Sequence, residues 1–266
     1  MKQLKAKILS NDKVAEGFYR MRIESAYLAK NTKPGQFVEV RCSDDVDPLL
    51  RRPLGAHRIS PGGIDILYEV VGKGTEILAR KKKGEDLDVI GPLGNGFEIN
   101  NSEASVLVAG GIGVAPMLTL AESIGHQVTR SPGHQKSKIH VIIGAKTKSN
   151  ILCEKEFKNL KCNVRVATED GSKGHKGLAT DVLKKLLVTW QPGNLATIYA
   201  CGPTGMLKAV AAIAKDKNIP CQVSLEERMA CGVGVCLGCP VKVKTNHEYK
   251  MVCKDGPVFD AEEISW

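Results

Sequence analysis

Residues 104–125, ASVLVAGGIGVAPMLTLAESIG, decide the fold of this 266-residue chain. An apolar run typical of a strand is followed by a glycine-containing turn and then by an amphipathic run typical of a helix. Residues 138–160 and 196–219 repeat this order. Strands that alternate with helices predict a parallel sheet with helices packed on it. We therefore expect an α/β parallel-sheet domain over residues 101–220.

The segments on either side of this domain have different patterns. Residues 1–100 contain short alternating or apolar runs, such as 36–42 and 63–72, separated by turns rich in Gly, Pro and Asn. This spacing is typical of antiparallel strands and predicts a small β-barrel domain. Residues 221–266 carry four of the nine cysteines in a short span after Ser224. The sequence thus predicts a multi-domain protein: a β-barrel, an α/β domain and a small C-terminal cysteine-rich domain.

Composition and charge narrow the class of protein. Hydrophobic residues make up 42% of the chain, which is enough to build its cores without disulfides. The net charge is +9, yet residues 221–266 hold five Lys or Arg against seven Asp or Glu, a net of −2. Aromatic residues are only 5% and are not interleaved with the lysines, which argues against nucleic-acid binding. The sequence shows no signal-peptide pattern and no unbroken apolar span, so we expect a cytoplasmic protein that does not enter a membrane.

The clustered cysteines have the spacing of an iron-sulfur site. Cys231, Cys236 and Cys239 are spaced C-x4-C-x2-C, and Cys253 follows after thirteen residues. Plant-type [2Fe-2S] centres use this arrangement of one loop plus a distant ligand, and intervening glycines let the backbone curl around the sulfides. We expect these four cysteines to ligate iron and the other five not to: Cys42, Cys153, Cys162, Cys201 and Cys221. A zinc site and disulfides remain the alternatives.

Two glycine-containing strand ends are candidate nucleotide sites. Gly110, Gly111 and Gly113 lie between the first α/β strand and its helix, where backbone amides could hold a pyrophosphate. Tight turns of this kind also occur without a ligand. The sequence Cys201-Gly202-Pro203 ends another strand, at the edge where α/β sheets bind ligands, although a small buried cysteine is an equal alternative.

A nicotinamide site and a [2Fe-2S] cluster in one chain imply a third cofactor. Nicotinamide exchanges two electrons as a hydride and the cluster exchanges one, so a flavin is needed between them. Arg51 and Arg52 precede a proline and could grip a pyrophosphate, or could be ordinary surface arginines. Gly72, Gly74 and Thr75 form another anion-binding turn before a helix. Lys146 and Lys148 do not decide between NAD and NADP, since lysines in such a loop are usually solvated.

The order of these motifs resembles a known superfamily. Arg-Pro-Leu, Gly-Lys-Gly-Thr, Gly-Gly-Ile-Gly-Val-Ala-Pro and Cys-Gly-Pro follow one another as in the ferredoxin-NADP reductase superfamily. Residues 225–242 and 251–264 are similar to the electron-transfer subunits of NAD-linked bacterial dihydroorotate dehydrogenases. The resemblance implies an oxidoreductase subunit of pyrimidine biosynthesis with FAD, one [2Fe-2S] cluster and NAD as cofactors. It also implies a separate FMN-containing dihydroorotate dehydrogenase catalytic subunit as partner, in a heterotetramer of two copies of each.

The resemblance also implies roles for single residues. The flavin side takes a turn at Arg52, Pro53 and Leu54, the neighbouring Gly55, a strand beside the flavin at Leu67, Tyr68, Glu69 and Val70, and Gly74 and Thr75 at its pyrophosphate. The nicotinamide side takes Gly110, Gly111, Gly113, Cys201, Gly202 and Pro203, with Cys201 as the catalytic residue. Gly55 departs from the family, which has Ser or Thr there to hydrogen-bond the flavin near N5. A backbone amide, a water or His57 would have to replace that hydroxyl.

Two other functions remain open at this stage. One is a related flavin and [2Fe-2S] subunit that serves a hydrogenase or a ferredoxin-coupled transhydrogenase. The other is a non-catalytic module with a zinc knuckle.

Overall fold

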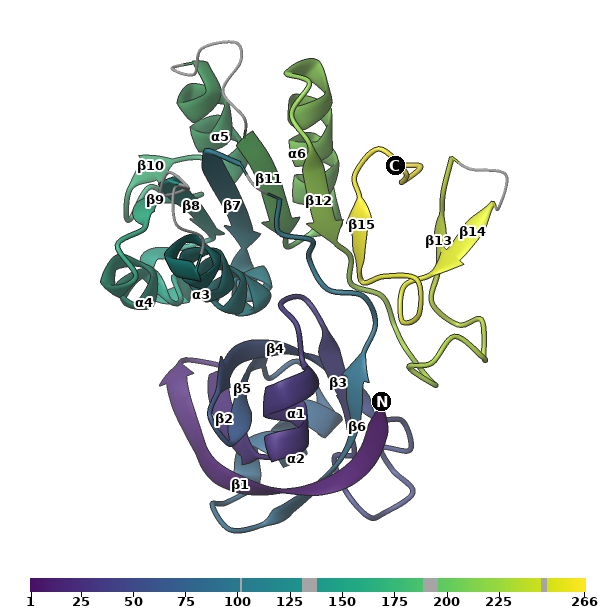
Figure 1. The fold of residues 1–266 in the computed structure, drawn as a ribbon. Helices are drawn as coiled ribbons and strands as arrows, with labels where there is room; N and C mark the ends of the chain where they lie inside the picture. The colour runs from purple at the N-terminus through teal and green to yellow at the C-terminus, as the bar shows by residue number, and fades with distance from the viewer. Residues whose placement is uncertain (101, 131–137, 189–195, 245–247) are drawn as a thin grey trace.

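The N-terminal part of the computed structural model is a closed antiparallel barrel, as predicted. The structure describes residues 1–100, 102–130, 138–188, 196–244 and 248–266. Six strands pair in the order β1-β2-β5-β4-β3-β6 (Figure 1). Their bounds are Lys2–Ala15, Phe18–Glu24, Phe37–Val40, Arg52–Ser60, Gly63–Glu69 and Asp86–Leu93 for β1 to β6. Two short helices, α1 (Ala26–Asn31) and α2 (Lys73–Arg80), complete this domain.

The barrel core follows from the alternation that the sequence shows. In β6 every second residue is buried, and the fully buried side chains Ile8, Ile23 and Ile66 come from β1, β2 and β5. Leu28 of α1 and Leu78 of α2 are buried in the same core. Closure removes free strand edges, so this domain offers a rigid frame for the segments at its ends.

The second part is a seven-stranded sheet in the order β10-β9-β8-β7-β11-β12-β15. The strands β7 to β12 are parallel and span Ala104–Gly110, Lys138–Ala145, Asn163–Thr168, His175–Lys176, Ala196–Cys201 and Cys221–Ser224. All seven residues of β7 are buried because helices cover both sheet faces. The helices α3 and α4 (Ala115–Arg130, Glu154–Asn159) cover one face, and α5 and α6 (Ala179–Val188, Thr204–Asp216) cover the other. Figure 1 shows both pairs.

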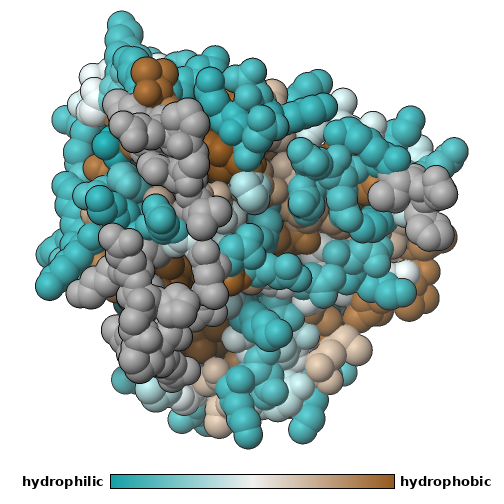
Figure 2. All heavy atoms as spheres, turned by 45° about the horizontal axis from the view of Figure 1, so that its top comes forward, coloured by the Kyte–Doolittle hydropathy of each residue, from teal (hydrophilic) through white to brown (hydrophobic). Residues whose placement is uncertain are grey.

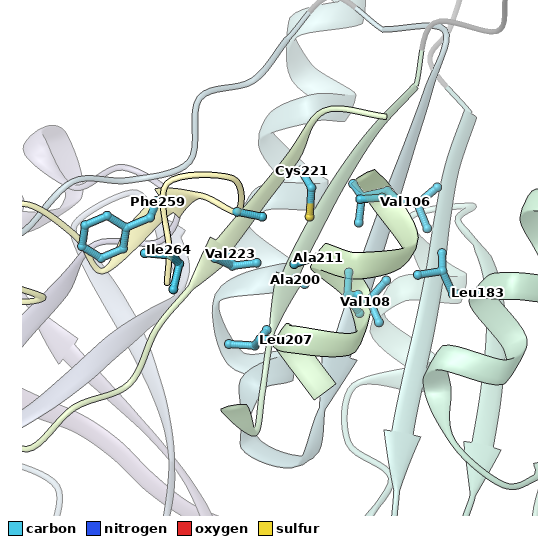
Figure 3. Close-up of a cluster of buried hydrophobic side chains, with 14 of the residues drawn as sticks. Val106, Val108, Leu183, Ala200, Leu207, Ala211, Cys221, Val223, Phe259 and Ile264 are labelled. Carbon is cyan, nitrogen blue, oxygen red and sulfur yellow. The ribbon is translucent and has the colours of Figure 1, made fainter. Parts of the chain in front are cut away.

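The C-terminal segment shares this sheet and its core. Strand β12 pairs with β11, and β15 (Val258–Asp260) joins antiparallel to β12. Phe259 and Ile264 belong to one buried cluster with Val223 and Leu207 (Figure 3). The boundary expected at residue 221 therefore falls between two paired strands of one sheet. A separate hairpin, β13 with β14 (Pro240–Lys242, Tyr249–Met251), carries the region between the cysteines.

No helix within the described ranges is long and apolar enough to cross a bilayer. Figure 2 shows that hydrophilic side chains dominate the face at the α5 and α6 end of the molecule.

Candidate functional site

Arg52 and the start of helix α2 form an anion-binding corner. Arg52 is the first residue of β4, and its Nη1 donates to the Leu50 carbonyl at 2.6 Å. This contact holds the guanidinium over Gly74, where a Cβ atom would stand 2.7 Å from Nε. A side chain at residue 74 would displace the guanidinium, so glycine permits this close approach at the first turn of α2. A cation beside a helix N-terminus suits a pyrophosphate, so these residues fit FAD.

The two neighbouring residues of the predicted corner have structural tasks. Arg51 binds both carboxylate oxygens of Asp88 at 3.0 Å each, which fastens the start of β4 to β6. The Thr75 hydroxyl accepts from the Val71 amide at 2.9 Å and donates to the Gly72 carbonyl at 3.0 Å. Thr75 therefore shapes the turn with its side chain and offers an anion its backbone amide. Of the two predicted arginines, Arg51 therefore fastens β4 to β6, and Arg52 faces the anion-binding corner.

The residues expected along the flavin do not all face one way. Arg52, Pro53 and Leu54 lie in strand β4, so the expected turn at Arg-Pro-Leu was wrong. A Cβ at Gly55 would meet nothing within 4 Å, which leaves open space beside the strand.

The residues expected beside the flavin at positions 67–70 also differ from one another in where their side chains lie. Tyr68 is buried in the barrel and its hydroxyl donates to Asn11 at 3.0 Å, so its side chain serves the core. Leu67 is buried on the side of α3, and Glu69 and Val70 are half-buried.

The two nicotinamide motifs meet at the carboxyl ends of β7 and β11. The turn Gly111–Val114 follows β7 directly and leads into α3. Gly113 approaches the Cys201 carbonyl so closely that a Cβ atom would overlap it. A Cβ on Gly202 would stand 2.9 Å from the Gly110 nitrogen. Segments almost ninety residues apart thus build one corner, at the edge where α/β sheets bind nucleotides.

The Cys201 thiol is held in its neutral form. Burial raises the pKa of Cys201 to about 12, and the nearby Glu226 carboxylate adds to the rise while a hydrogen bond with Ser224 opposes it. At neutral pH the group is therefore a thiol. It can pack against a ring, but it is not a ready nucleophile.

The four predicted cysteine ligands come together around one loop. Backbone amides donate to their sulfurs: Gly234 to Cys253 at 3.1 Å, Val233 to Cys231 at 3.4 Å, Cys236 to Cys231 at 3.5 Å and Cys253 to Cys239 at 3.4 Å. Amide donors of this kind stabilise the sulfur ligands of iron-sulfur clusters. Cys239 and Cys253 are buried, and Cys236 is exposed. The donor set fits a [2Fe-2S] cluster.

The pKa values of two of these thiols, Cys231 and Cys253, are shifted in opposite directions. Burial acts to raise the pKa of Cys231, but the amides of Cys236 and Val233 outweigh it and lower the value to about 6. Burial and the adjacent Cys239 raise the pKa of Cys253 to about 12. A bound cation would stabilise the thiolate of Cys253 as well. Among the described residues no three such side chains surround a single-ion position, but each iron of a [2Fe-2S] cluster takes only two cysteines.

The other five cysteines lie outside the cysteine loop. Cys42 lies in the barrel core, Cys162 and Cys221 are buried against the sheet, and Cys153 and Cys201 pack on the α3 side. All nine cysteines are free thiols, so the disulfide alternative was wrong.

Glu39, a buried acid beneath the cysteine loop, was not predicted from the sequence. Glu39 of β3 is 1% exposed, and a Cβ on Gly232 would stand 2.6 Å from its Cγ. Neither carboxylate oxygen has a hydrogen-bond partner among the described residues. Burial raises the pKa of Glu39 to about 7, although the charge of Arg51 opposes the rise. The only signal was a single acid within the apolar run QFVEV.

Two family models match the chain. Residues 226–265 match the iron-sulfur cluster binding domain of dihydroorotate dehydrogenase B. Residues 107–212 match the oxidoreductase NAD-binding domain. The two matches cover the cysteine loop and the nucleotide corner described above.

Whole-chain relatives agree with these matches. The dihydroorotate dehydrogenase B (NAD(+)) electron transfer subunit of Desulforamulus reducens is 40% identical over 98% of this chain and 97% of the relative. That of Fusobacterium nucleatum is 39% identical over 96% and 95%. These relatives confirm the expected resemblance.

Solved structures confirm the fold class. The structure of an NADH-dependent reduced ferredoxin-NADP oxidoreductase, reported for flavin-based electron bifurcation, superposes with a TM-score of 0.84. It is 34% identical over 98% of this chain and 90% of that chain. A Neisseria gonorrhoeae ferredoxin NADP+ reductase with bound FAD and NADP has a TM-score of 0.67 at 15% identity, over 82% and 92%, and shows the shared fold alone.

Proposed function

This chain belongs to the family of electron transfer subunits of dihydroorotate dehydrogenase B (NAD(+)), and we propose that it relays electrons from a catalytic subunit to NAD+. In this proposal electrons leave the FMN of a dihydroorotate dehydrogenase subunit, pass through the [2Fe-2S] cluster and FAD, and reach NAD+. The reaction belongs to pyrimidine biosynthesis and takes place in the cytoplasm.

One contact carries the proposal: the cysteine loop rests on the flavin barrel. Gly232 lies over Glu39 of β3, and Glu39 pairs in register with Pro53 of β4. The cluster loop is therefore one strand away from the strand that begins with Arg52. Short steps between redox groups are what a relay needs.

The chain's own residues have distinct tasks in this relay. The Arg52 fork and the α2 amides would hold the FAD pyrophosphate, with the Gly55 face of β4 beside the ring. FAD supplies the exchange between single electrons and a hydride. The Gly110–Ala115 turn would hold the nicotinamide dinucleotide, and the neutral Cys201 thiol would pack against its ring. The amides of the cysteine loop would keep the ligating thiolates in place.

The partner proposal rests on the exposed side of the cysteine loop. Val235 and Leu237 flank Cys236 and are 78% and 67% exposed. Exposed apolar side chains next to a redox group are suited to a protein interface. We infer that the FMN subunit docks here, near the acidic C-terminal segment, in a heterotetramer of two copies of each subunit.

Mixing the two purified subunits tests the proposal. The chain alone should reduce artificial dyes with NADH but should not oxidise dihydroorotate. Addition of an FMN-containing dihydroorotate dehydrogenase subunit should give NADH formation that depends on dihydroorotate. Turnover of dihydroorotate by this chain alone, or coupled activity that survives loss of the cluster, would contradict the relay.

A second candidate is a subunit of a bifurcating ferredoxin-NADP oxidoreductase. It is favoured by the 34% identity and 0.84 TM-score to such a protein. The same mixing experiment separates the two, because this candidate would give no NADH from dihydroorotate with an FMN subunit.

A further inference from the structure

Strand β4 and helix α3 meet in a polar contact that links the flavin strand to the nicotinamide turn. His57 is 1% exposed, and its Nδ1 lies 2.9 Å from the Ala115 carbonyl oxygen. A carbonyl only accepts, so Nδ1 carries the proton and donates it. His57 comes two residues after Gly55, and Ala115 comes two residues after Gly113. The hydrogen bond therefore joins the two candidate cofactor sites across the domain boundary.

A bulge in β4 makes this contact possible. The register of β4 against β5 shifts between Ala56 and Arg58, so the strand turns at His57. Bulges re-aim side chains, and here both His57 and Arg58 reach α3. The Arg58 Nε donates to Glu122 at 2.8 Å. Figure 1 shows α3 lying beside the β4 end of the barrel.

The residues of α3 that contact β4 lie on one face of the helix. The Thr119 hydroxyl donates to the His57 carbonyl, so His57 is held through both its ring and its backbone. Ala115, Thr119 and Glu122 follow the i, i+4, i+7 spacing of a single helix face. Thr119 is as buried as His57, so both hydrogen bonds are shielded from water.

The charge state of His57 keeps the contact constant. Burial lowers the pKa of His57 to about 4, although the Ala115 carbonyl opposes the shift. The nearby Arg58 and Arg20 charges lower it further. At neutral pH the ring is uncharged and has one N–H, which is committed to Ala115.

We propose that His57 is a positioning residue that sets the flavin strand and the nicotinamide turn at the spacing needed for hydride transfer. The inference rests on the proposed function. In the step concerned, bound flavin and nicotinamide would exchange a hydride, two electrons with one proton: toward NAD+ in the proposed relay, and from NADH to FAD in the reverse direction that the test uses. The reacting atoms must approach to about 3–3.5 Å, and a misplacement of about 1 Å can cost about 100-fold in rate. Domains of one chain move relative to each other unless contacts hold them, and His57 is such a contact.

Four variants of the FAD- and cluster-loaded chain test this role. His57→Ala removes the ring donor, and His57→Asn offers an amide donor in its place. Thr119→Val removes the second hydrogen bond, and His175→Ala is the matched control, a half-buried histidine on β10. Anaerobic stopped-flow mixing with NADH would follow flavin reduction and the long-wavelength charge-transfer band, which reports stacking of nicotinamide on flavin. FAD content, iron content and flavin midpoint potential would be measured alongside.

We expect His57→Ala to weaken the charge-transfer band and to slow flavin reduction about tenfold or more. FAD, iron and midpoint potential should stay near wild type, His57→Asn should recover most of the rate, and His175→Ala should match wild type. An unchanged band and rate in both His57→Ala and Thr119→Val would overturn the proposal. Loss of FAD from His57→Ala but not from Thr119→Val would also overturn it, since that would make His57 a flavin ligand.

Two features keep this test decisive. Thr119→Val probes the same contact if His57→Ala fails to fold, and a wild-type rate in Thr119→Val would then overturn the proposal. The half-reaction between NADH and FAD needs no partner subunit. Its outcome is therefore independent of whether dihydroorotate supplies the electrons, which the mixing experiment decides.

Discussion

The flavin corner and the cysteine loop differ in how far the protein alone satisfies their charges. At the flavin corner Arg51 binds Asp88 in a bidentate ion pair and the Thr75 hydroxyl is committed to its turn, so among the described residues the charge of Arg52, held only by backbone carbonyls, is left for an anion. In the cysteine loop the pKa of Cys231 lies near 6 and that of Cys253 near 12, with the unpartnered Glu39 beneath. Contacts within the fold hold the first site in place, whereas in the second a bound metal would balance the charge of the thiolates.

The largest effect is expected in the cysteine loop. Changing Cys231, Cys236, Cys239 or Cys253 singly to serine should remove most of the iron, because the cluster needs four thiolates. FAD should stay bound, since the Arg52 corner is formed by other elements. Iron assays and the visible spectrum of each purified variant measure both cofactors.

Cys153→Ser is the control for this series, because Cys153 packs near α4, away from the loop. Its iron content should equal that of wild type. Full iron retention in Cys253→Ser, or loss of iron in Cys153→Ser, would break the distinction between the two sites.

The reciprocal experiment concerns the flavin corner. Arg52→Ala should copurify with much less FAD, because each charge-assisted hydrogen bond to the pyrophosphate is worth about 1.5–3 kcal/mol, or roughly 10- to 100-fold in affinity. Iron content should remain near normal. Arg80→Ala, an exposed arginine at the other end of α2, is the matched control. Unchanged FAD occupancy in Arg52→Ala, measured by flavin absorbance after gel filtration, would move the flavin site elsewhere.

The sequence predicted what depends on local pattern or spacing. The barrel follows from alternation, the α/β sheet from strand and helix order, and the cysteine site from the C-x4-C-x2-C spacing. Each of these signals lies within a short stretch of chain. The family resemblance then placed the NAD-binding region before the iron-sulfur region, which is the order of the two family-model matches.

What the sequence missed depends on contacts between distant segments. Arg51 and Arg52 are identical neighbours, yet successive residues of an extended chain point to opposite faces, so one meets Asp88 and the other Gly74. Tyr68 turned inward for the same reason. Glu39 is covered by Gly232, which lies far along the chain. No periodicity in one segment reports which other segment will cover it.

The smallest effect, and the finest test of the comparison, concerns Glu39. Its pKa of about 7 in the fold lies above the usual value of 4.5, so the folded chain binds more protons than the unfolded chain between these values. Stability therefore falls as the pH rises from about 4.5 to 7 and stays reduced above it. Glu39→Gln removes the charge, and should stabilise the protein at pH 8 by on the order of 1–3 kcal/mol.

Thermal unfolding at pH 5 and pH 8, at one scan rate, measures this prediction. We expect the midpoint of Glu39→Gln to exceed that of wild type by roughly 2–10 °C at pH 8 and to match it at pH 5. Glu24→Gln, an exposed acid at the end of β2, should show no difference at either pH. An equal shift of Glu39→Gln at both pH values would mean that packing, and not the buried charge, separates the two variants. No shift at pH 8 would mean that the carboxylate beneath the loop is already balanced, as Arg51 and Asp88 are beside the flavin corner.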